Sequence, residues 1–169
     1  STQFVPGNLY QYLNSSDATW SVSINGRPYK AELENGFAVI RRKWQPGDTI
    51  QLYLPMPVRF NRSNEAVAAN YGRVAITRGP LVYAAEGVDN VGAVQAYYLD
   101  QTTENTSSSV QNIEQGILEG IPQISLPAHR QTDNQIQPVS LKMIPYYAWN
   151  NRGNSTMLVW LPTTGKDKQ

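Results

Sequence analysis

Apolar and polar residues alternate with a period of two along most of the chain, which is the pattern of strands that bury one face. Residues 20–24 form the first alternating run, and residues 29–33 form a second run after Asn25-Gly26. Asn-Gly between two such runs is typical of a hairpin, because both central residues of a type I′ turn have positive φ. The spacing also allows a loop slightly longer than two residues. The first third of the chain is therefore predicted to contain a β-hairpin.

The same alternation continues to the end of the chain. Turn residues interrupt it at Asn35-Gly36, Pro46-Gly47-Asp48 and Gly79-Pro80, where glycine accepts positive φ and proline fixes φ. No window of helical length has a 3.6-residue period. Short strands separated by turns predict an all-β protein with little helix, an antiparallel β-sandwich of the jelly-roll kind. Further strands are expected at 37–42, 50–54, 73–78, 81–85, 97–99, 139–143 and 156–161.

Polar composition marks the connections between these strands. Residues 100–111 and 131–137 are expected to be loops, as is the segment 127–130 that contains His129. A domain boundary is expected near Pro57 to Arg62, because the prolines at 55 and 57 end one group of strands. That first group is too small to be stable unless it packs on something else.

The charge of the chain excludes two classes of partner. Lys and Arg number 14 against 13 Asp and Glu, a net charge of +1, which gives no field to attract nucleic acid or an anionic membrane. No stretch approaches the roughly 20 apolar residues of a membrane span. Neither nucleic acid nor membrane is expected as a partner.

The chain offers few residues for catalysis, since it has no Cys and one His. Thiol nucleophiles and cysteine-containing metal sites are thereby excluded. His129 has no nucleophile motif near it and is interpreted as a surface histidine. A pair of carboxylates could hydrolyse a glycoside only if both pointed into one cleft. The turn at 86–90 does not match a calcium loop, and turn capping by Asp89 or Asn90 is favoured there. We predict no catalytic and no metal-binding residue. The carboxylates considered are Glu32, Glu34, Glu65, Glu86, Asp89, Asp100 and Glu104.

The densest aromatic cluster lies at 144–153, in a predicted loop after a strand. Trp20 and Trp160 are in phase with apolar strand positions and are expected in the core, whereas this cluster mixes aromatic rings with amides and an arginine. Such aromatic area is unusual on a surface unless something covers it. Contact with another domain is favoured over sugar binding, and packing on the chain's own sheet stays open. The candidate contact residues are Tyr146, Tyr147, Trp149, Asn150 and Arg152.

Three separated stretches together carry a family resemblance. They are 35–48 with Leu54-Pro55-Met56, then 72–83 ending in Leu81-Val82-Tyr83, and finally 144–153 with 157–162. In order and spacing the chain resembles, from about residue 8 to residue 162, the C-terminal part of glycoside hydrolase family 127. These proteins are β-L-arabinofuranosidases that were formerly grouped as a domain of unknown function.

The resemblance implies a parent enzyme with an N-terminal (α/α)6 catalytic barrel followed by two β-sandwich domains. It also implies a cysteine nucleophile, a glutamate and a zinc ion in the parent enzyme, at positions that this chain does not contain. The family often has Cys after the Leu-Val-Tyr motif, where this chain has Ala84, and that Cys is not the nucleophile. By the same resemblance, residues 1–58 are a truncated part of the middle sandwich, and residues 59–169 are the C-terminal accessory sandwich.

The sequence thus predicts a non-enzymatic piece of a larger bacterial glycoside hydrolase that acts on arabinose-containing glycans. Its expected role is to brace the catalytic barrel of the same parent enzyme, with no cofactor of its own. The alternative is an autonomous carbohydrate-binding module that uses exposed aromatic rings. The compartment stays open, with a periplasmic or secreted parent enzyme favoured.

Overall fold

The chain is all β, and its strands pair antiparallel throughout the part that the structure describes. The computed structural model describes residues 9–100, 107–133 and 135–163. Helical turns in these residues are of the 3-10 type and three residues long. The predicted all-β, antiparallel fold with little helix is therefore confirmed. Contacts divide the chain into a larger unit, with residues 9–15 and 58–163, and a smaller unit, Ser16–Pro57. The domain boundary at residue 58 stays a prediction.

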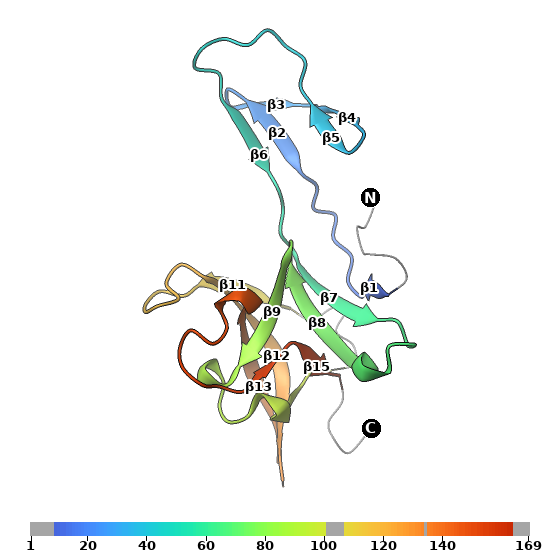
Figure 1. The fold of residues 1–169 in the computed structure, drawn as a ribbon, viewed down its shortest axis with the longest axis vertical. Coiled ribbons are helices and arrows are strands. Elements are labelled where there is room, and N and C mark those ends of the chain that lie inside the picture. The colour runs from blue at the N-terminus through green and yellow to red at the C-terminus, as the bar shows by residue number, and fades with distance from the viewer. Residues whose placement is uncertain (1–8, 101–106, 134, 164–169) are drawn as a thin grey trace. The chain divides into compact units, whose positions relative to one another are not determined.

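The larger unit contains one bent, ten-stranded sheet, in the order β1-β7-β8-β9-β13-β12-β10, with β11, β14 and β15 at its margins (Figure 1). Its strands are β1 Tyr10–Tyr12, β7 Val58–Ser63, β8 Arg73–Arg78, β9 Leu81–Glu86, β10 Tyr97–Tyr98, β11 Ser109–Asn112, β12 Pro122–Thr132, β13 Gln135–Pro145, β14 Met157–Leu158 and β15 Trp160–Pro162. The helical turns are η1 Ala68–Asn70, η2 Gly87–Asp89, η3 Val94–Ala96 and η5 Tyr146–Ala148.

The two halves of the bent sheet pack against one another over a single core. Phe60 of β7 and Ile76 of β8 come from one half, and Leu126 of β12 and Leu141 of β13 come from the other. All four are at most 2% exposed. Tyr83 of β9 lies where the halves join, and its ring is fully buried in the same core. The period-two pattern predicted this packing because alternate residues of each strand point to one face.

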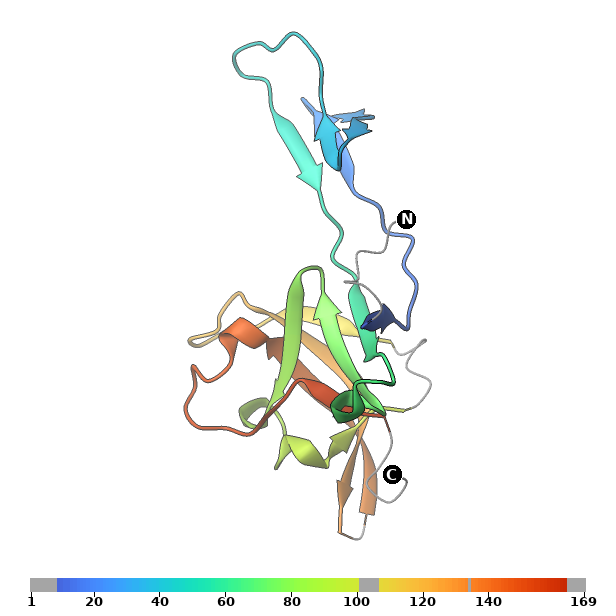
Figure 2. The same cartoon turned by 45° about the vertical axis from the view of Figure 1, so that its right-hand side comes forward.

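The β12–β13 hairpin is longer than the sequence predicted. The segments 127–130 and 131–137 were expected to be loops, and this expectation is wrong, because β12 continues to Thr132 and β13 begins at Gln135. Figure 2 shows the end of this hairpin, in orange, projecting beyond the rest of the sheet. Residues 135–138 are exposed, so neither face selects apolar side chains and the alternation is lost. Polar composition alone does not distinguish such an arm from a loop.

The smaller unit contains a three-stranded sheet, β3-β2-β6, and a two-stranded sheet, β4-β5. Its strands are β2 Ser21–Ile24, β3 Arg27–Tyr29, β4 Glu32–Glu34, β5 Phe37–Val39 and β6 Ile50–Tyr53. Ile24 pairs with Arg27 across Asn25-Gly26, so the loop has two residues and not the longer form that the spacing allowed. Asn25 has φ 50° and Gly26 has φ 73°, as a type I′ turn requires. Asn35-Gly36 makes the same turn between β4 and β5.

Two tryptophans that were expected in the core lie outside it. Trp20 is 37% exposed and precedes β2. Trp160 alternates with the fully buried Leu161 on β15 and is only partly buried, so it lies on the other face of the sheet. The expectation failed because a period of two defines two faces and does not say which one is inside.

Candidate functional site

The aromatic cluster is a short, well-defined loop at the end of β13. The chain leaves the sheet at Pro145, forms the helical turn η5, and turns again at Asn150, which has φ 64°. The backbone N–H of Trp149 donates to the carbonyl of Tyr146 at 3.2 Å. Ala148 is 3% exposed and packs with Ile144 in a small second apolar cluster. The loop is thus anchored at its centre by one small apolar residue.

The aromatic side chains of this loop differ in exposure. Tyr147 is 60% exposed and Tyr146 is 48% exposed. The Tyr146 ring stacks on the Trp149 indole, with centroids 6.1 Å apart and planes inclined by 25°. Trp149 is partly buried, and its Nε1 atom is buried without a hydrogen-bond partner among the described residues. Exposed area is therefore concentrated on the two tyrosines.

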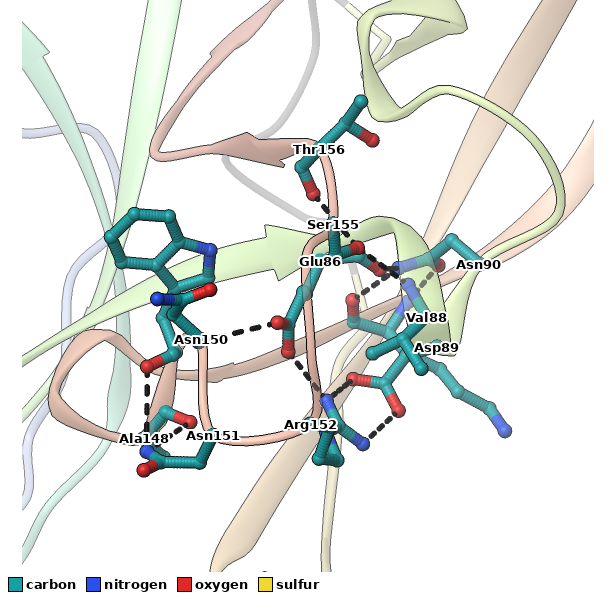
Figure 3. Close-up of polar contacts among 12 residues, drawn as sticks. Glu86, Val88, Asp89, Asn90, Ala148, Asn150, Asn151, Arg152, Ser155 and Thr156 are labelled. Carbon is teal, nitrogen blue, oxygen red and sulfur yellow. Dashed lines mark hydrogen bonds and ion pairs between the residues drawn. The ribbon is translucent and has the colours of Figure 1, made fainter.

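Arg152 closes the loop by binding two carboxylates (Figure 3). Its Nη2 atom lies 2.7 Å from Oε2 of Glu86 at the end of β9, and its two terminal nitrogens donate to Asp89 at 2.8 Å and 2.5 Å. The Glu86 side chain is 0% exposed and that of Arg152 is 20% exposed. The Asn150 N–H also donates to Glu86, at 3.3 Å. A buried carboxylate is tolerated because a guanidinium and a backbone donor compensate its charge.

The segment after β9 is fixed to the same cluster by Asn90. Its side-chain amide donates to the carbonyls of Glu86 at 2.8 Å and Lys142 at 3.0 Å, and its Oδ1 accepts from the Lys142 N–H at 2.9 Å.

Hydrogen bonding to Asp89 is the main reason why the pKa of Arg152 is raised above its ordinary value, and hydrogen bonding to Glu86 adds to the rise. Arg152 therefore keeps its charge at every working pH.

The structure thus separates the candidate residues into two groups. Tyr146, Tyr147 and Asn150 are exposed, and Trp149 is partly exposed. Arg152 points inward and holds the loop on β9, a pairing that the sequence did not reveal because the partners are 66 residues apart. Whether these residues contact another domain or a sugar stays a prediction.

The other sequence candidates with described partners occur in two pairs, Asp100 with His129 and Glu32 with Glu34. His129 lies on β12, stacks on Tyr98 with centroids 5.1 Å apart, and has Nε2 2.9 Å from Asp100. It is part of a strand, not of a loop. Glu32 and Glu34 both bind the exposed Arg41. The remaining two carboxylates are Glu65, which is exposed, and Glu104, which lies outside the described residues.

The described residues were compared with the requirements of a metal site and of a membrane-spanning helix. No three His, Cys, Asp or Glu residues there are grouped so that they could hold a metal ion. The zinc that the family resemblance implies for the parent enzyme therefore does not fit the residues described. No described helix has the length and apolar character needed to cross a membrane.

The smaller unit exposes an unusual amount of apolar surface. Val22 and Ile24 are its only buried apolar residues within the described range 16–57. Their register partners on β6, Leu52 and Ile50, share their face of the sheet and are 56% and 52% exposed. This face of the three-stranded sheet is thus apolar, covered at β2 and uncovered at β6. Four more large apolar side chains of this unit are at least 62% exposed: Leu33, Phe37, Tyr53 and Leu54.

Both units match models of known protein domains. Residues 58–162 match the model of the glycoside hydrolase family 127 C-terminal domain, and residues 13–56 match that of the beta-L-arabinofuranosidase, GH127 middle domain. The chain belongs to glycoside hydrolase family 127. The predicted resemblance is confirmed.

Individual relatives agree with the family 127 assignment. A non-reducing end beta-L-arabinofuranosidase of Bifidobacterium longum subsp. longum is 33% identical over 161 residues, which is 86% of this chain and 24% of the relative. A solved GH127 beta-arabinofuranosidase is 36% identical with a TM-score of 0.84, covering 95% of this chain and 25% of its own. A GH127 beta-L-arabinofuranosidase from Geobacillus stearothermophilus T6 is 32% identical with a TM-score of 0.74, covering 94% and 25%. The chain therefore spans about a quarter of the length of these relatives.

Proposed function

We propose that this family 127 region is a non-catalytic accessory part of a β-L-arabinofuranosidase-like enzyme and that it braces the enzyme's catalytic barrel. Two facts support this. The relatives are about four times as long as the region that matches. The described residues group no metal ligands, and the carboxylates that converge there are neutralised by Arg41 or by Arg152. Arabinose-containing glycans are then substrates of the whole enzyme.

The apolar face of the smaller unit, which is uncovered at β6, carries this proposal. A unit of this size with two buried apolar residues does not have enough core to be stable alone. Covering the exposed half of one large apolar side chain contributes roughly 1 kcal/mol. The exposed apolar side chains of this unit would therefore contribute several kcal/mol together when the rest of the enzyme packs on them. The face supports a role in domain packing, with the middle domain completed by polypeptide outside this chain.

The aromatic loop is proposed as a second contact with the catalytic barrel. Tyr146 and Tyr147 are the exposed members, and Tyr, Trp and Arg are the side chains enriched at interfaces. Arg152 contributes by holding the loop in place through Glu86 and Asp89. The loop thus acts as a preformed surface whose rings lose little conformational entropy on docking.

The apolar face is tested with neighbouring residues of β6 in the full-length enzyme. Leu52→Ala removes an apolar side chain from the face, and Gln51→Ala changes the next residue, which points to the opposite face. We expect Leu52→Ala to lower the melting temperature and to increase proteolytic cleavage between the domains. Gln51→Ala should leave both unchanged. Equal behaviour of the two variants would argue against packing on this face.

The loop is tested by comparing two exposed tyrosines. Tyr147→Ala is compared with Tyr71→Ala, since Tyr71 is 69% exposed and lies before β8, outside the loop. Trp149→Ala is made as well. Loss of activity on an aryl β-L-arabinofuranoside or a lower melting temperature is expected for the loop variants alone. Unchanged activity and an unchanged melting temperature in both Tyr147→Ala and Trp149→Ala would exclude the loop as a docking surface.

The alternative is a carbohydrate-binding module centred on the same loop. The observation that favours it is the exposed Tyr146 ring, stacked on Trp149 beside the exposed amide of Asn150. This alternative predicts saturable quenching of tryptophan fluorescence when the 169-residue chain is titrated with arabino-oligosaccharides. The bracing role predicts no change.

A further inference from the structure

The larger unit has a second surface of interest, on the side of the sheet that faces away from the core. Register places Tyr12 of β1, Asn61 of β7, Ala75 of β8 and Trp160 of β15 in one row across four strands. Alternate residues on the same strands, such as Phe60, point into the core. We call this surface the outer face. By register it contains Tyr10, Tyr12, Arg59, Asn61, Ser63, Arg73, Ala75, Thr77, Trp160 and Pro162.

Aromatic rings cover much of the outer face. Tyr10 and Trp160 stack with centroids 6.0 Å apart and planes inclined by 26°. The Arg59 guanidinium lies over the Tyr12 ring, 5.0 Å from its centroid. The outward face of an antiparallel sheet is commonly polar and solvated. Three rings and a stacked arginine on such a face are typical of a binding surface.

Two polar side chains of the outer face are buried. Asn61 is 9% exposed, and its amide donates to Oγ1 of Thr77 at 2.9 Å and to the carbonyl of Ala75 at 3.3 Å. Ser63 is 5% exposed, and its hydroxyl has no hydrogen-bond partner among the described residues. A buried hydroxyl without a partner costs free energy. Both side chains are buried, so they belong to the packing of the face and are not ligand contacts.

The outer face is positively charged. Arg59 Nη1 donates to the Asn14 carbonyl at 2.7 Å, and Arg73 Nη1 donates to the Trp160 carbonyl at 3.3 Å. A guanidinium has five N–H donors, so both arginines have donors left. No carboxylate of the described residues lies within 4.0 Å of either guanidinium, and the face contains no Asp or Glu. Its two charges have no counter-ion on the face.

We propose that the outer face binds an acidic oligosaccharide, a glycan that carries uronic acid carboxylates. Aromatic rings offer flat apolar area for the C–H faces of sugar rings. Arginine pairs bidentately with carboxylates. The lack of any acidic residue on the face favours an acidic glycan over a neutral one.

The exposure of the face favours a small ligand over a protein partner. Among its residues only Tyr10, at 37%, is exposed, and all others are partly or fully buried. A stable protein interface needs about 800 Å² on each side. A row of two or three sugar rings needs much less. Glycan binding here does not depend on the proposed bracing role, because the outer face shares no residue with the aromatic loop or with the smaller unit.

The test is a calorimetric titration of the 169-residue chain with a trimer of galacturonic acid, and in parallel with a neutral arabinose trimer. We expect the acidic trimer to bind in the millimolar range or tighter and to lose affinity as salt rises. Arg73→Gln and Tyr10→Ala should each raise the dissociation constant about tenfold, the equivalent of 1.4 kcal/mol. Arg41→Gln is the matched control for Arg73→Gln, because Arg41 is an exposed arginine outside the outer face that binds Glu32 and Glu34, and it should bind as the unsubstituted chain does.

Four results would overturn the proposal. They are no binding of the acidic trimer at about 10 mM, equal binding of the neutral trimer, equal affinity of Arg73→Gln and the unsubstituted chain, or the same loss of affinity in Arg41→Gln as in Arg73→Gln. Circular dichroism of each variant shows that the fold is kept, and Arg73→Gln is the decisive variant because it leaves the aromatic packing in place. If the face is instead covered by protein in the full-length enzyme, the acidic trimer will bind the 169-residue chain but not the enzyme, and the proposal fails for the enzyme.

Discussion

Arg152→Ala should destabilise the larger unit strongly, because it leaves the carboxylate of Glu86 buried without its partner. Glu86 is 0% exposed, and Arg152 Nη2 lies 2.7 Å from its Oε2. Removal of one partner of a buried ion pair costs about 3–5 kcal/mol. A domain of this size unfolds with about 5–15 kcal/mol, so the loss is a large part of the total. The melting temperature falls by about 2–4 °C per kcal/mol, which gives a decrease of roughly 6–20 °C.

The assay is urea unfolding followed by circular dichroism, with calorimetry for the melting temperature. Arg41→Ala is the matched control, because Arg41 also binds two carboxylates but its side chain is 63% exposed. Exposed ion pairs contribute little, so this variant should unfold close to the unsubstituted chain. The contrast between the two arginines isolates the effect of burial.

A double-mutant cycle separates the ion pair from the packing of the arginine. Glu86→Gln removes the buried charge, so the double variant Glu86→Gln with Arg152→Ala should be more stable than Arg152→Ala alone. A loss below about 1 kcal/mol for Arg152→Ala would refute the reasoning, since a buried charge that loses its partner costs several times more. An additive cycle would refute it as well.

Three further predictions concern single polar groups. Tyr83→Phe removes a buried hydroxyl without a partner among the described residues and should raise stability by up to about 1 kcal/mol in urea unfolding. Burial raises the pKa of Tyr83, and the nearby Arg78 opposes this rise. The contribution of neutral Tyr83 to stability is therefore present below the ordinary tyrosine pKa and is lost as pH rises through the raised value. The phenylalanine variant should resist alkaline unfolding better. Asn90→Ala should cost about 1–3 kcal/mol in urea unfolding, because it leaves backbone groups of Glu86 and Lys142 without partners. The hydrogen bond from Asn25 lowers the pKa of Asp48 below its ordinary value. The contribution of ionised Asp48 to stability is therefore present above the ordinary aspartate pKa and is lost as pH falls through the lowered value. Asp48→Asn should make the melting temperature depend less on pH between about pH 5 and pH 2.5, the range where aspartate titrates.

The sequence determined the local elements of this protein. Two-residue turns at Asn25-Gly26 and Asn35-Gly36 follow from the residues that tolerate positive φ. The alternation around β8 and β9 predicted strands because a strand with one buried face must repeat every two residues. The lack of cysteine and the single histidine restricted the chemistry available to the chain. Three separated motifs identified the family.

Only the tertiary structure decided which faces are buried and which distant side chains meet. Alternation defines two faces of a strand, but packing on other strands decides which face is buried. Trp160 was expected in the core for its alternation and lies on the outer face. The β12–β13 arm was expected to be a loop because no core selects apolar residues along it. Arg152 was expected on the surface, yet it points inward because it binds Glu86, which is 66 residues away in the sequence. Such a pairing depends on the arrangement of β9 beside β13, which no local pattern of residues specifies.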